Sequence, residues 1–162
     1  MPHSKTPASS AESETPLYKV KNSKVHGRGV FAARKIPADT RIVEYCGERI
    51  SEKKADKRGS SDPDNPFHTF FFSLESGKMI DGGVGGSDAR WINHSCAPNC
   101  EAREKKGRVF IHALRDIRRG EELNYDYGLV LEGRHTKKIK KSYECRCGAA
   151  ECRGTMLAPK ER

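Results

Sequence analysis

Short runs of β-forming residues alternate with polar turns along most of the chain. Each run is four to nine residues long, a length typical of strands rather than of helices. The pattern therefore predicts a mostly β protein with short helices. The runs cover residues 17–22, 42–50, 67–74, 78–81, 100–106 and 107–114.

Local signals refine three of these predictions. The last two runs meet at Lys-Lys-Gly-Arg, which favours a β-hairpin with Val109, Phe110 and Ile111 in the core. Gly47 interrupts residues 42–50 and predicts a bulge or bend there. Residues 51–58 are charged and begin with a serine suited to a helix N-cap, so we expect a short, exposed helix.

The composition limits the class of protein. With 162 residues, the chain suits one domain with a single core. Hydrophobic residues make up 35% of it, and no apolar run approaches the roughly 20 residues of a membrane helix. Residues 1–16 predict a disordered tail. Because they lack the apolar stretch of a secretory signal, we expect an intracellular protein with reduced cysteines.

The chain is strongly basic. It has 31 Lys and Arg against 22 Asp and Glu, a formal net charge of +9. Residues 134–141 hold five Lys or Arg and no acid, so we expect a basic linker at residues 131–143. Two interpretations stay open: contact with nucleic-acid phosphates, a nucleosome or an acidic protein face, or a solvated basic surface without a partner.

The C-terminal cysteines have the spacing of metal ligands. Cys145, Cys147 and Cys152 form Cys-x-Cys-x4-Cys, which brings three thiolates within reach of one ion. A tetrahedral zinc site needs one more ligand. The spacing leaves Cys96 and Cys100 equally eligible.

A polar pair stands between an apolar entry and a proline exit. Residues 89–100 read Ala-Arg-Trp-Ile-Asn-His-Ser-Cys-Ala-Pro-Asn-Cys. Trp91 and Ile92 can enter a core, whereas Asn93 and His94 need hydrogen-bond partners in the protein or in a ligand. Pro98 ends the segment in a turn.

Taken with four other motifs, this stretch resembles the signature of SET-domain protein lysine methyltransferases that carry a post-SET zinc motif. The others are Val-His-Gly-Arg-Gly-Val-Phe at residues 25–31, Glu-Tyr-Cys-Gly-Glu at 44–48, Gly-Glu-Glu-Leu-Asn-Tyr-Asp-Tyr at 120–127, and the cysteine motif at 145–152. Three positions depart from the usual pattern: Ser87 stands where Asn is common, Trp91 for Phe, and Asn124 for Thr.

The resemblance implies a site. Its catalytic tyrosine would be Tyr127, with Tyr45 lining the lysine channel and Tyr125 governing how many methyl groups are added. S-adenosylmethionine would be held by His26, Gly27, Arg28, Tyr45, Asn93, His94 and Arg146. Zinc would be held by Cys96, Cys145, Cys147 and Cys152.

The resemblance also implies a fold and a function. We expect a SET domain at residues 17–130, built of several small antiparallel sheets with a threaded, pseudoknot-like C-terminal segment, and a post-SET zinc module at residues 144–162. The activity would be methyl transfer to a lysine ε-amine, with a histone tail as the commonest substrate. Because Tyr125 carries a hydroxyl, mono- and dimethyllysine would be the main products. The location would be the nucleus in a eukaryote and the cytoplasm in a bacterium.

Glu121 and Glu122 look like a catalytic carboxylate pair. Adjacent strand positions point to opposite faces, however, which favours turn and strand-edge roles. Two alternatives from other classes remain for the whole chain: an inactive SET-like module that binds partner proteins, and a zinc-dependent nucleic-acid-binding protein.

Overall fold

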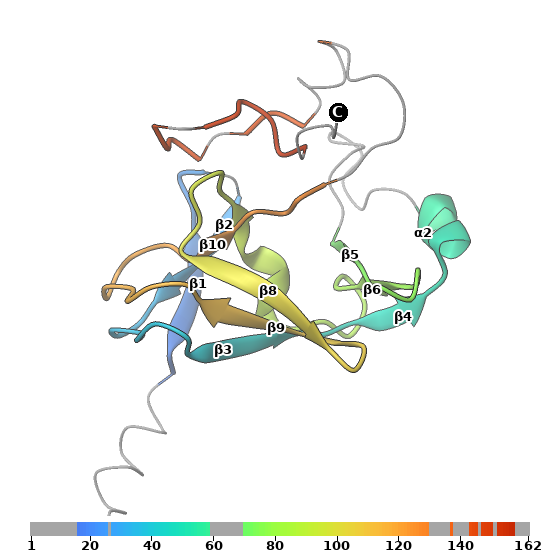
Figure 1. Cartoon of the computed structure of the whole chain (residues 1–162), viewed down its shortest axis with the longest axis horizontal. Helices are drawn as coiled ribbons and strands as arrows, with labels where there is room; N and C mark the ends of the chain where they lie inside the picture. The colour runs from blue at the N-terminus through green and yellow to red at the C-terminus, as the bar shows by residue number, and fades with distance from the viewer. Residues whose placement is uncertain are drawn as a thin grey trace, which may run out of the picture.

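The computed structural model describes residues 16–25, 27–58, 70–129, 137, 143–145, 147–150 and 152–157. His26, Arg146, nearly all of the expected tail and most of the expected linker lie outside the described residues. Short strands dominate the described part (Figure 1). They are β1 (Tyr18–Asn22), β2 (Arg28–Ala32), β3 (Arg41–Tyr45), β4 (Glu48–Ile50), β5 (Phe71–Ser73), β6 (Met79–Asp81), β7 (Asn93–His94), β8 (Cys100–Lys105), β9 (Arg108–Ala113) and β10 (Asn124–Tyr125).

The central sheet has three antiparallel strands in the order β3-β9-β8. The predicted hairpin is confirmed: β8 and β9 are joined at Lys106 and Gly107, whose φ values of 52° and 77° match the left-handed turns that close two-residue hairpins. Val109, Ile111 and Ala113 alternate along β9 and are fully buried. This face of the sheet therefore supplies much of the core.

A second three-stranded sheet has the order β4-β6-β5 and lies beside α2 (Glu52–Arg58), the predicted exposed helix, of which only Ala55 is buried. Gly47 separates β3 from β4, as the sequence predicts. A Cβ at Gly47 would lie 2.2 Å from the carbonyl oxygen of Asp81. The glycine is therefore required by the close approach of the β6 backbone, which holds this sheet against the end of β3.

Two small pairs complete the described fold. β1 and β2 are antiparallel, whereas β7 and β10 are parallel and align Asn93 with Asn124 and His94 with Tyr125. The parallel pair joins segments about thirty residues apart in the sequence. This pairing lays the chain after Leu123 beside the Asn93–His94 segment, as expected for the threaded arrangement.

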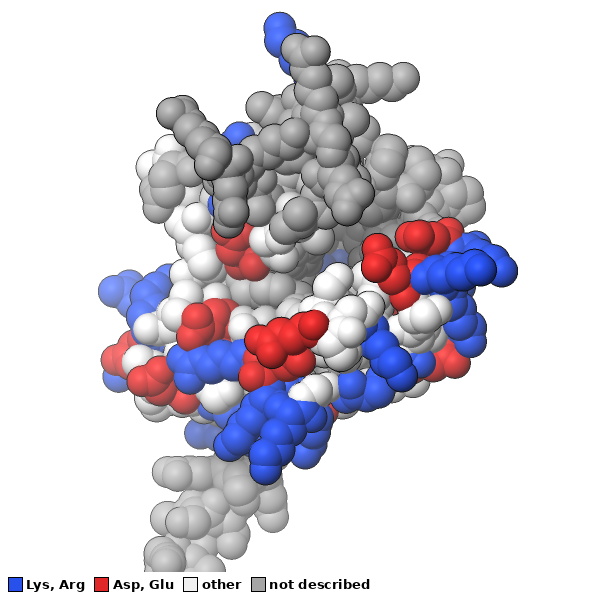
Figure 2. Space-filling model, turned by 45° about the vertical axis from the view of Figure 1, so that its right-hand side comes forward, with Lys and Arg blue, Asp and Glu red and all other residues white. Residues whose placement is uncertain are grey.

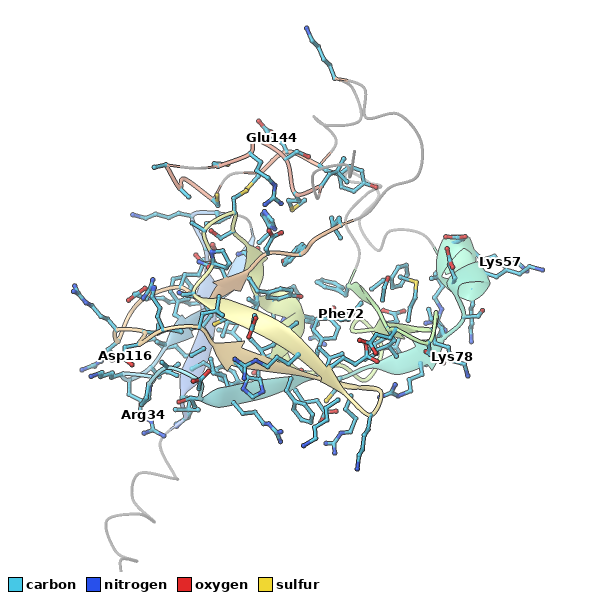
Figure 3. All side chains as sticks on the ribbon, viewed as in Figure 1. Arg34, Lys57, Phe72, Lys78, Asp116 and Glu144 are labelled. Carbon is cyan, nitrogen blue, oxygen red and sulfur yellow. The ribbon has the colours of Figure 1, made fainter. Side chains whose placement is uncertain are left out.

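One apolar cluster connects the sheets. Its largest fully buried members are Ile36, Ile80, Ile92, Ile111, Ile117 and Leu123. Phe72 reaches towards this cluster from β5 (Figure 3). In the part of the chain that the structure describes, no helix has the length and apolar character needed to cross a membrane.

Candidate active site and cysteine cluster

Three tyrosines converge at the end of the central sheet. The rings of Tyr125 and Tyr127 lie 4.9 Å apart between centroids. Tyr45 lies near both, since a charge on Tyr125 would raise the pKa of Tyr45, and a charge on Tyr125 or Tyr45 would raise the pKa of Tyr127. The Tyr45 hydroxyl donates to the carbonyl of Phe70, and that of Tyr127 donates to the carbonyl of Ile92. Both hydroxyls are thus oriented by backbone oxygens.

Burial sets the protonation of these tyrosines. Desolvation raises the pKa of Tyr45, Tyr125 and Tyr127 above the usual value for a phenol. All three side chains therefore remain neutral near pH 7. Such phenols can orient a nucleophile or polarise it, but they do not act as bases.

His94 connects the tyrosines to the cysteines. Its Nδ1 accepts a hydrogen bond from the backbone N–H of Tyr127 at 3.0 Å, so the proton resides on Nε2, which lies 3.4 Å from Cys96 Sγ. Burial lowers the pKa of the imidazole to about 4, so the ring is neutral. The ring also meets Tyr127 edge to face at 5.3 Å.

Asn93 is the first residue of β7 and contacts the first glycine motif, which is Val-His-Gly-Arg-Gly-Val-Phe at residues 25–31. Its Nδ2 donates to the carbonyl of Arg28 at 3.0 Å and to Glu122 Oε2 at 2.8 Å. The two glycines of the motif serve different purposes. Gly27 adopts a left-handed φ of 47° with open space around it, whereas a Cβ at Gly29 would lie 2.4 Å from Glu122 Oε2.

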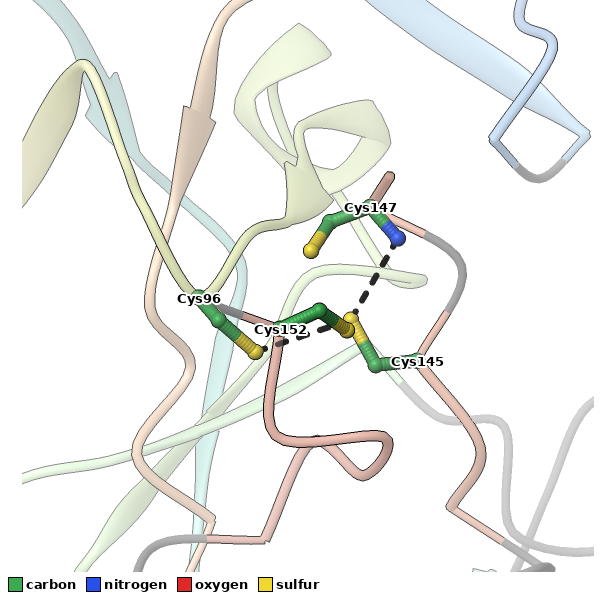
Figure 4. A group of neighbouring side chains, drawn as sticks. All are labelled: Cys96, Cys145, Cys147 and Cys152. Atoms are coloured by element: carbon green, nitrogen blue, oxygen red, sulfur yellow. Dashed lines mark hydrogen bonds between the residues drawn. The ribbon is translucent and has the colours of Figure 1, made fainter. Parts of the chain in front are cut away.

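Four of the six cysteines form one cluster (Figure 4). The Sγ atoms of Cys96, Cys145, Cys147 and Cys152 all lie within 4.8 Å of one another. Cys96 and Cys145 are 3.8 Å apart, which matches the roughly 3.8 Å edge of a tetrahedron with Zn–S bonds of about 2.3 Å. Cys100 instead begins β8 inside the core, where burial raises the pKa of its thiol to about 12.

The backbone around the cluster suits thiolate ligands. The N–H groups of Arg153, Cys147 and Gly154 donate to the sulfurs of Cys96, Cys145 and Cys152, respectively, at 3.3–3.4 Å. Such hydrogen bonds favour the charged form of a thiol. The donor set and its spacing therefore fit a tetrahedral Zn²⁺ ion.

An ion pair holds the cysteine segment, defined as the described residues within 143–157, against β10. Both terminal nitrogens of Arg153 donate to the carboxylate of Asp126, at 2.8 and 3.1 Å. Asp126 immediately precedes Tyr127. Leu157 is buried and forms a bridge with Leu129. The cysteine segment is therefore tied to the chain on both sides of Tyr127.

Each of the three residues that depart from the usual family pattern contacts another segment of the chain. Ser87 caps the short 3-10 helix η1 (Asp88–Trp91) and donates to the carbonyl of Glu44 at 2.6 Å. Trp91 meets Phe70 edge to face with centroids 5.2 Å apart. The side-chain oxygen of Asn124 accepts from the backbone of Asn99 at 2.9 Å. Each substitution therefore joins segments that lie beside the site.

Comparison with known proteins identifies the family. The SET domain model matches residues 27–128. The chain is 38% identical over 143 residues to an H3 lysine-4 specific histone-lysine N-methyltransferase of Chaetomium globosum, and 38% identical over 138 residues to histone-lysine N-methyltransferase 2B of Homo sapiens. These matches cover 85% and 83% of this chain. The chain belongs to the SET-domain family.

A solved structure agrees with this assignment. The crystal structure of KRYPTONITE in complex with mCHG DNA and SAH matches with a TM-score of 0.69 and 29% identity, over 86% of this chain and 29% of that one. The chain spans only 13% and 5% of the length of the two curated relatives. The similarity thus concerns one domain of much longer proteins.

The structure brings several of the predicted site residues together. Tyr125 and Tyr127 are in ring contact near Tyr45, the His94 ring contacts Tyr127, Asn93 is adjacent to His94 on β7, and the four expected cysteines form one cluster. Glu122, Asp126 and Arg153 were missed as parts of the site. The sequence indicates only that these residues lie close to the motifs. Glu122 and Asp126 fall inside Gly-Glu-Glu-Leu-Asn-Tyr-Asp-Tyr, and Arg153 follows Cys152 directly.

Proposed function

We propose that this domain is an S-adenosylmethionine-dependent protein-lysine N-methyltransferase. The observation that carries the proposal is the neutral hydroxyl of Tyr127, which is oriented by the carbonyl of Ile92, while its ring contacts Tyr125 and His94 and lies near Tyr45. Membership in the SET family supports it. So does the SAH in the matching structure, since SAH is what remains after S-adenosylmethionine gives up its methyl group.

The residues near β7 fit the cofactor. Bound S-adenosylmethionine supplies an electrophilic methyl group on a sulfonium. Carbonyl and phenol oxygens line the area around Tyr127, and oxygen dipoles suit a cation. Asn93 and His94 are buried polar side chains on β7, and the backbone at Gly27 is open to approach. We assign the cofactor to Gly27, Arg28, Tyr45, Asn93 and His94, with His26 and Arg146 as further predicted contacts outside the described residues.

The protein's contribution to methyl transfer is positioning. The attacking lysine nitrogen must be neutral, and burial among aromatic rings lowers the pKa of an amine. Because the hydroxyl hydrogen of Tyr127 is donated to Ile92, its oxygen retains lone pairs that can accept an N–H of the substrate amine. Tyr45 narrows the same channel. Holding the nitrogen in line with the methyl group accounts for the acceleration.

The cysteine cluster has a structural role in this proposal. We assign Zn²⁺ to Cys96, Cys145, Cys147 and Cys152. Four protein ligands fill a tetrahedral site, so no coordination position would remain for a catalytic water. Bound zinc contributes folding free energy to a segment with little core of its own. It would hold the cysteine segment beside Tyr127.

The substrate is proposed to be a histone lysine, with histone H3 the first to test and the nucleus as the location. The names of the curated relatives support this choice. The net charge of +9 supports contact with a nucleosome, including the predicted contact of the basic linker with DNA. On the described face in Figure 2, however, basic and acidic side chains are intermingled, which suits a protein partner better than a continuous phosphate backbone.

The deciding experiment is transfer of labelled methyl groups from S-adenosylmethionine to core histones, free and in nucleosomes, followed by mass spectrometry. Label on a defined lysine supports the proposal, with Tyr18→Phe on β1 as an active control. Cofactor binding without transfer to any histone would favour the inactive protein-binding module. DNA binding that weakens steeply with salt, without cofactor binding, would favour the nucleic-acid-binding protein.

A further inference from the structure

The two adjacent glutamates of the Gly-Glu-Glu-Leu motif have different environments. Glu121 faces outward and pairs with Arg115 at 3.0 Å. Glu122 faces inward, where its carboxylate accepts the Ser23 hydroxyl at 2.8 and 2.9 Å and the Asn93 amide at 2.8 Å. The expectation that the two side chains diverge is thus confirmed. Glu122 does not, however, behave as a simple strand-edge residue.

Glu122 joins three segments that are distant in the sequence. Ser23 follows β1 and precedes the Gly27 turn, Asn93 belongs to β7, and Gly29 of β2 leaves the space that the carboxylate fills. Backbone pairing fixes this location, because Glu122 forms a bridge with Phe31 and Leu123 donates to Val30 at 2.7 Å. The carboxylate therefore lies between the first glycine motif and the Asn-His pair.

The contact orients the Asn93 amide. Its Nδ2 has two hydrogens and donates to Glu122 Oε2 and to the carbonyl of Arg28. An ionised acceptor makes a stronger hydrogen bond than a neutral one. Without the carboxylate, the amide would lose its stronger acceptor and could turn over. The Ser23 hydroxyl would lose its acceptor at the same time.

We propose that Glu122 is a positioning residue for cofactor binding, which acts by holding the Asn93 amide and the turn at residues 23–29 in one arrangement. The proposal rests on the function proposed above, since it takes Asn93, Gly27 and Arg28 as cofactor contacts. The hydrogen bonds of Glu122 go to Ser23 and Asn93, and its charge is only the smallest of the causes that raise the pKa of Tyr127. Its removal therefore weakens the binding of S-adenosylmethionine and leaves methyl transfer at saturating cofactor nearly unchanged.

The test is calorimetric binding of S-adenosylmethionine and of SAH to the full zinc-loaded chain, together with KM and kcat and a thermal unfolding midpoint. Glu122→Ala is expected to weaken both ligands about tenfold or more, the effect of losing a hydrogen bond to a charged group. Glu122→Gln retains an oxygen that can accept from Asn93, so it should recover most of the affinity. Ser23→Ala should give an intermediate loss. Glu121→Gln, the matched control, should bind like the wild type.

Several outcomes would overturn the inference. One is wild-type affinity in Glu122→Ala. Another is an equal loss in the Ala and Gln variants, since rescue by the amide is required. A fall in kcat with unchanged KM for the cofactor would move Glu122 to another role. If Glu122→Ala does not fold, Ser23→Ala and Glu122→Gln still decide the question. Absence of cofactor binding by the wild type would refute the proposed function itself.

Discussion

The strands around Tyr127 and the cysteine segment are held in place by different interactions. β7 and β10 are surrounded by the apolar cluster, and their neighbours Ile92 and Leu123 are almost completely buried. Among the described residues of the cysteine segment, Leu157 alone is buried in this way. Other contacts of the cysteine segment include the sulfur cluster, the Arg153–Asp126 pair, and backbone and side-chain hydrogen bonds.

This difference means that the residues assigned to methyl transfer and the cysteine segment are positioned by different interactions. Hydrophobic burial can position these residues without any ion, because Asn93 and Tyr125 lie on strands β7 and β10 and Tyr127, two residues after β10, packs against the apolar cluster. The cysteine segment buries little apolar surface, so we expect its position to depend on the proposed zinc ion and on charge pairs. His94 lies at the boundary, between Tyr127 and Cys96.

The largest expected effect comes from removing the metal. Structural zinc can contribute on the order of 10 kcal/mol to the folding of the segment it closes. We therefore expect chelation, or Cys147→Ser, to expose the cysteine segment to hydrogen exchange and abolish methyl transfer, while β8 and β9 keep their protection. Cys46→Ser is the control. Unchanged exchange in the cysteine segment after complete zinc removal would contradict the comparison.

Tyr127→Phe should have the next largest effect. It tests the tyrosine site rather than the cysteine segment. Loss of the hydroxyl removes the group that orients the amine, and misplacement of a reacting atom costs about 100-fold in rate. Single-turnover kinetics should show this loss with cofactor affinity and zinc content unchanged. A rate within a few fold of the wild type would show that Tyr127 is not the catalytic tyrosine.

Breaking the Arg153–Asp126 pair should have a smaller effect. The pair is bidentate but partly exposed, so we expect Arg153→Gln to cost about 1 kcal/mol in the closure of the segment, or roughly fivefold faster exchange near Cys152. A double-mutant cycle with Asp126→Asn tests the coupling. Arg115→Gln, which breaks the Glu121 pair, should leave this exchange unaltered. Additive effects of the two substitutions would show that the Arg153–Asp126 pair does not hold the cysteine segment in place.

Tyr125→Phe should change the product more than the rate. Its side chain is buried beside Tyr127, so in the proposed lysine channel the loss of its hydroxyl would leave room for a further methyl group. We expect wild-type products to be mainly mono- and dimethyllysine, and the variant to make more di- and trimethyllysine at a rate within about threefold. Mass spectrometry of a histone peptide measures both. Predominant trimethylation by the wild type would refute the assignment.

Much of the fold follows from local pattern. The 100–114 hairpin, the charged helix and the bend at Gly47 were predictable because alternation, capping and turn residues act over a few positions. The reason for the bend was not, since the oxygen that excludes a Cβ at Gly47 belongs to Asp81. Similarly, the adjacency of Glu121 and Glu122 predicts opposite directions, but the partners of Glu122 lie 29 and 99 residues away.

The sequence by itself determined the set of polar residues and the order of the motifs, including three cysteines spaced for one ion. The spacing left Cys96 and Cys100 open and the family resemblance implied Cys96; the tertiary structure places Cys96, and not Cys100, in the cluster. Cys100 starts a strand whose inward positions fill the core, whereas Cys96 lies in the turn after β7 and meets the cysteine segment. The physical reason is that burial and ligand geometry depend on which distant strands pair, here β7 with β10, and spacing along the chain does not contain that information.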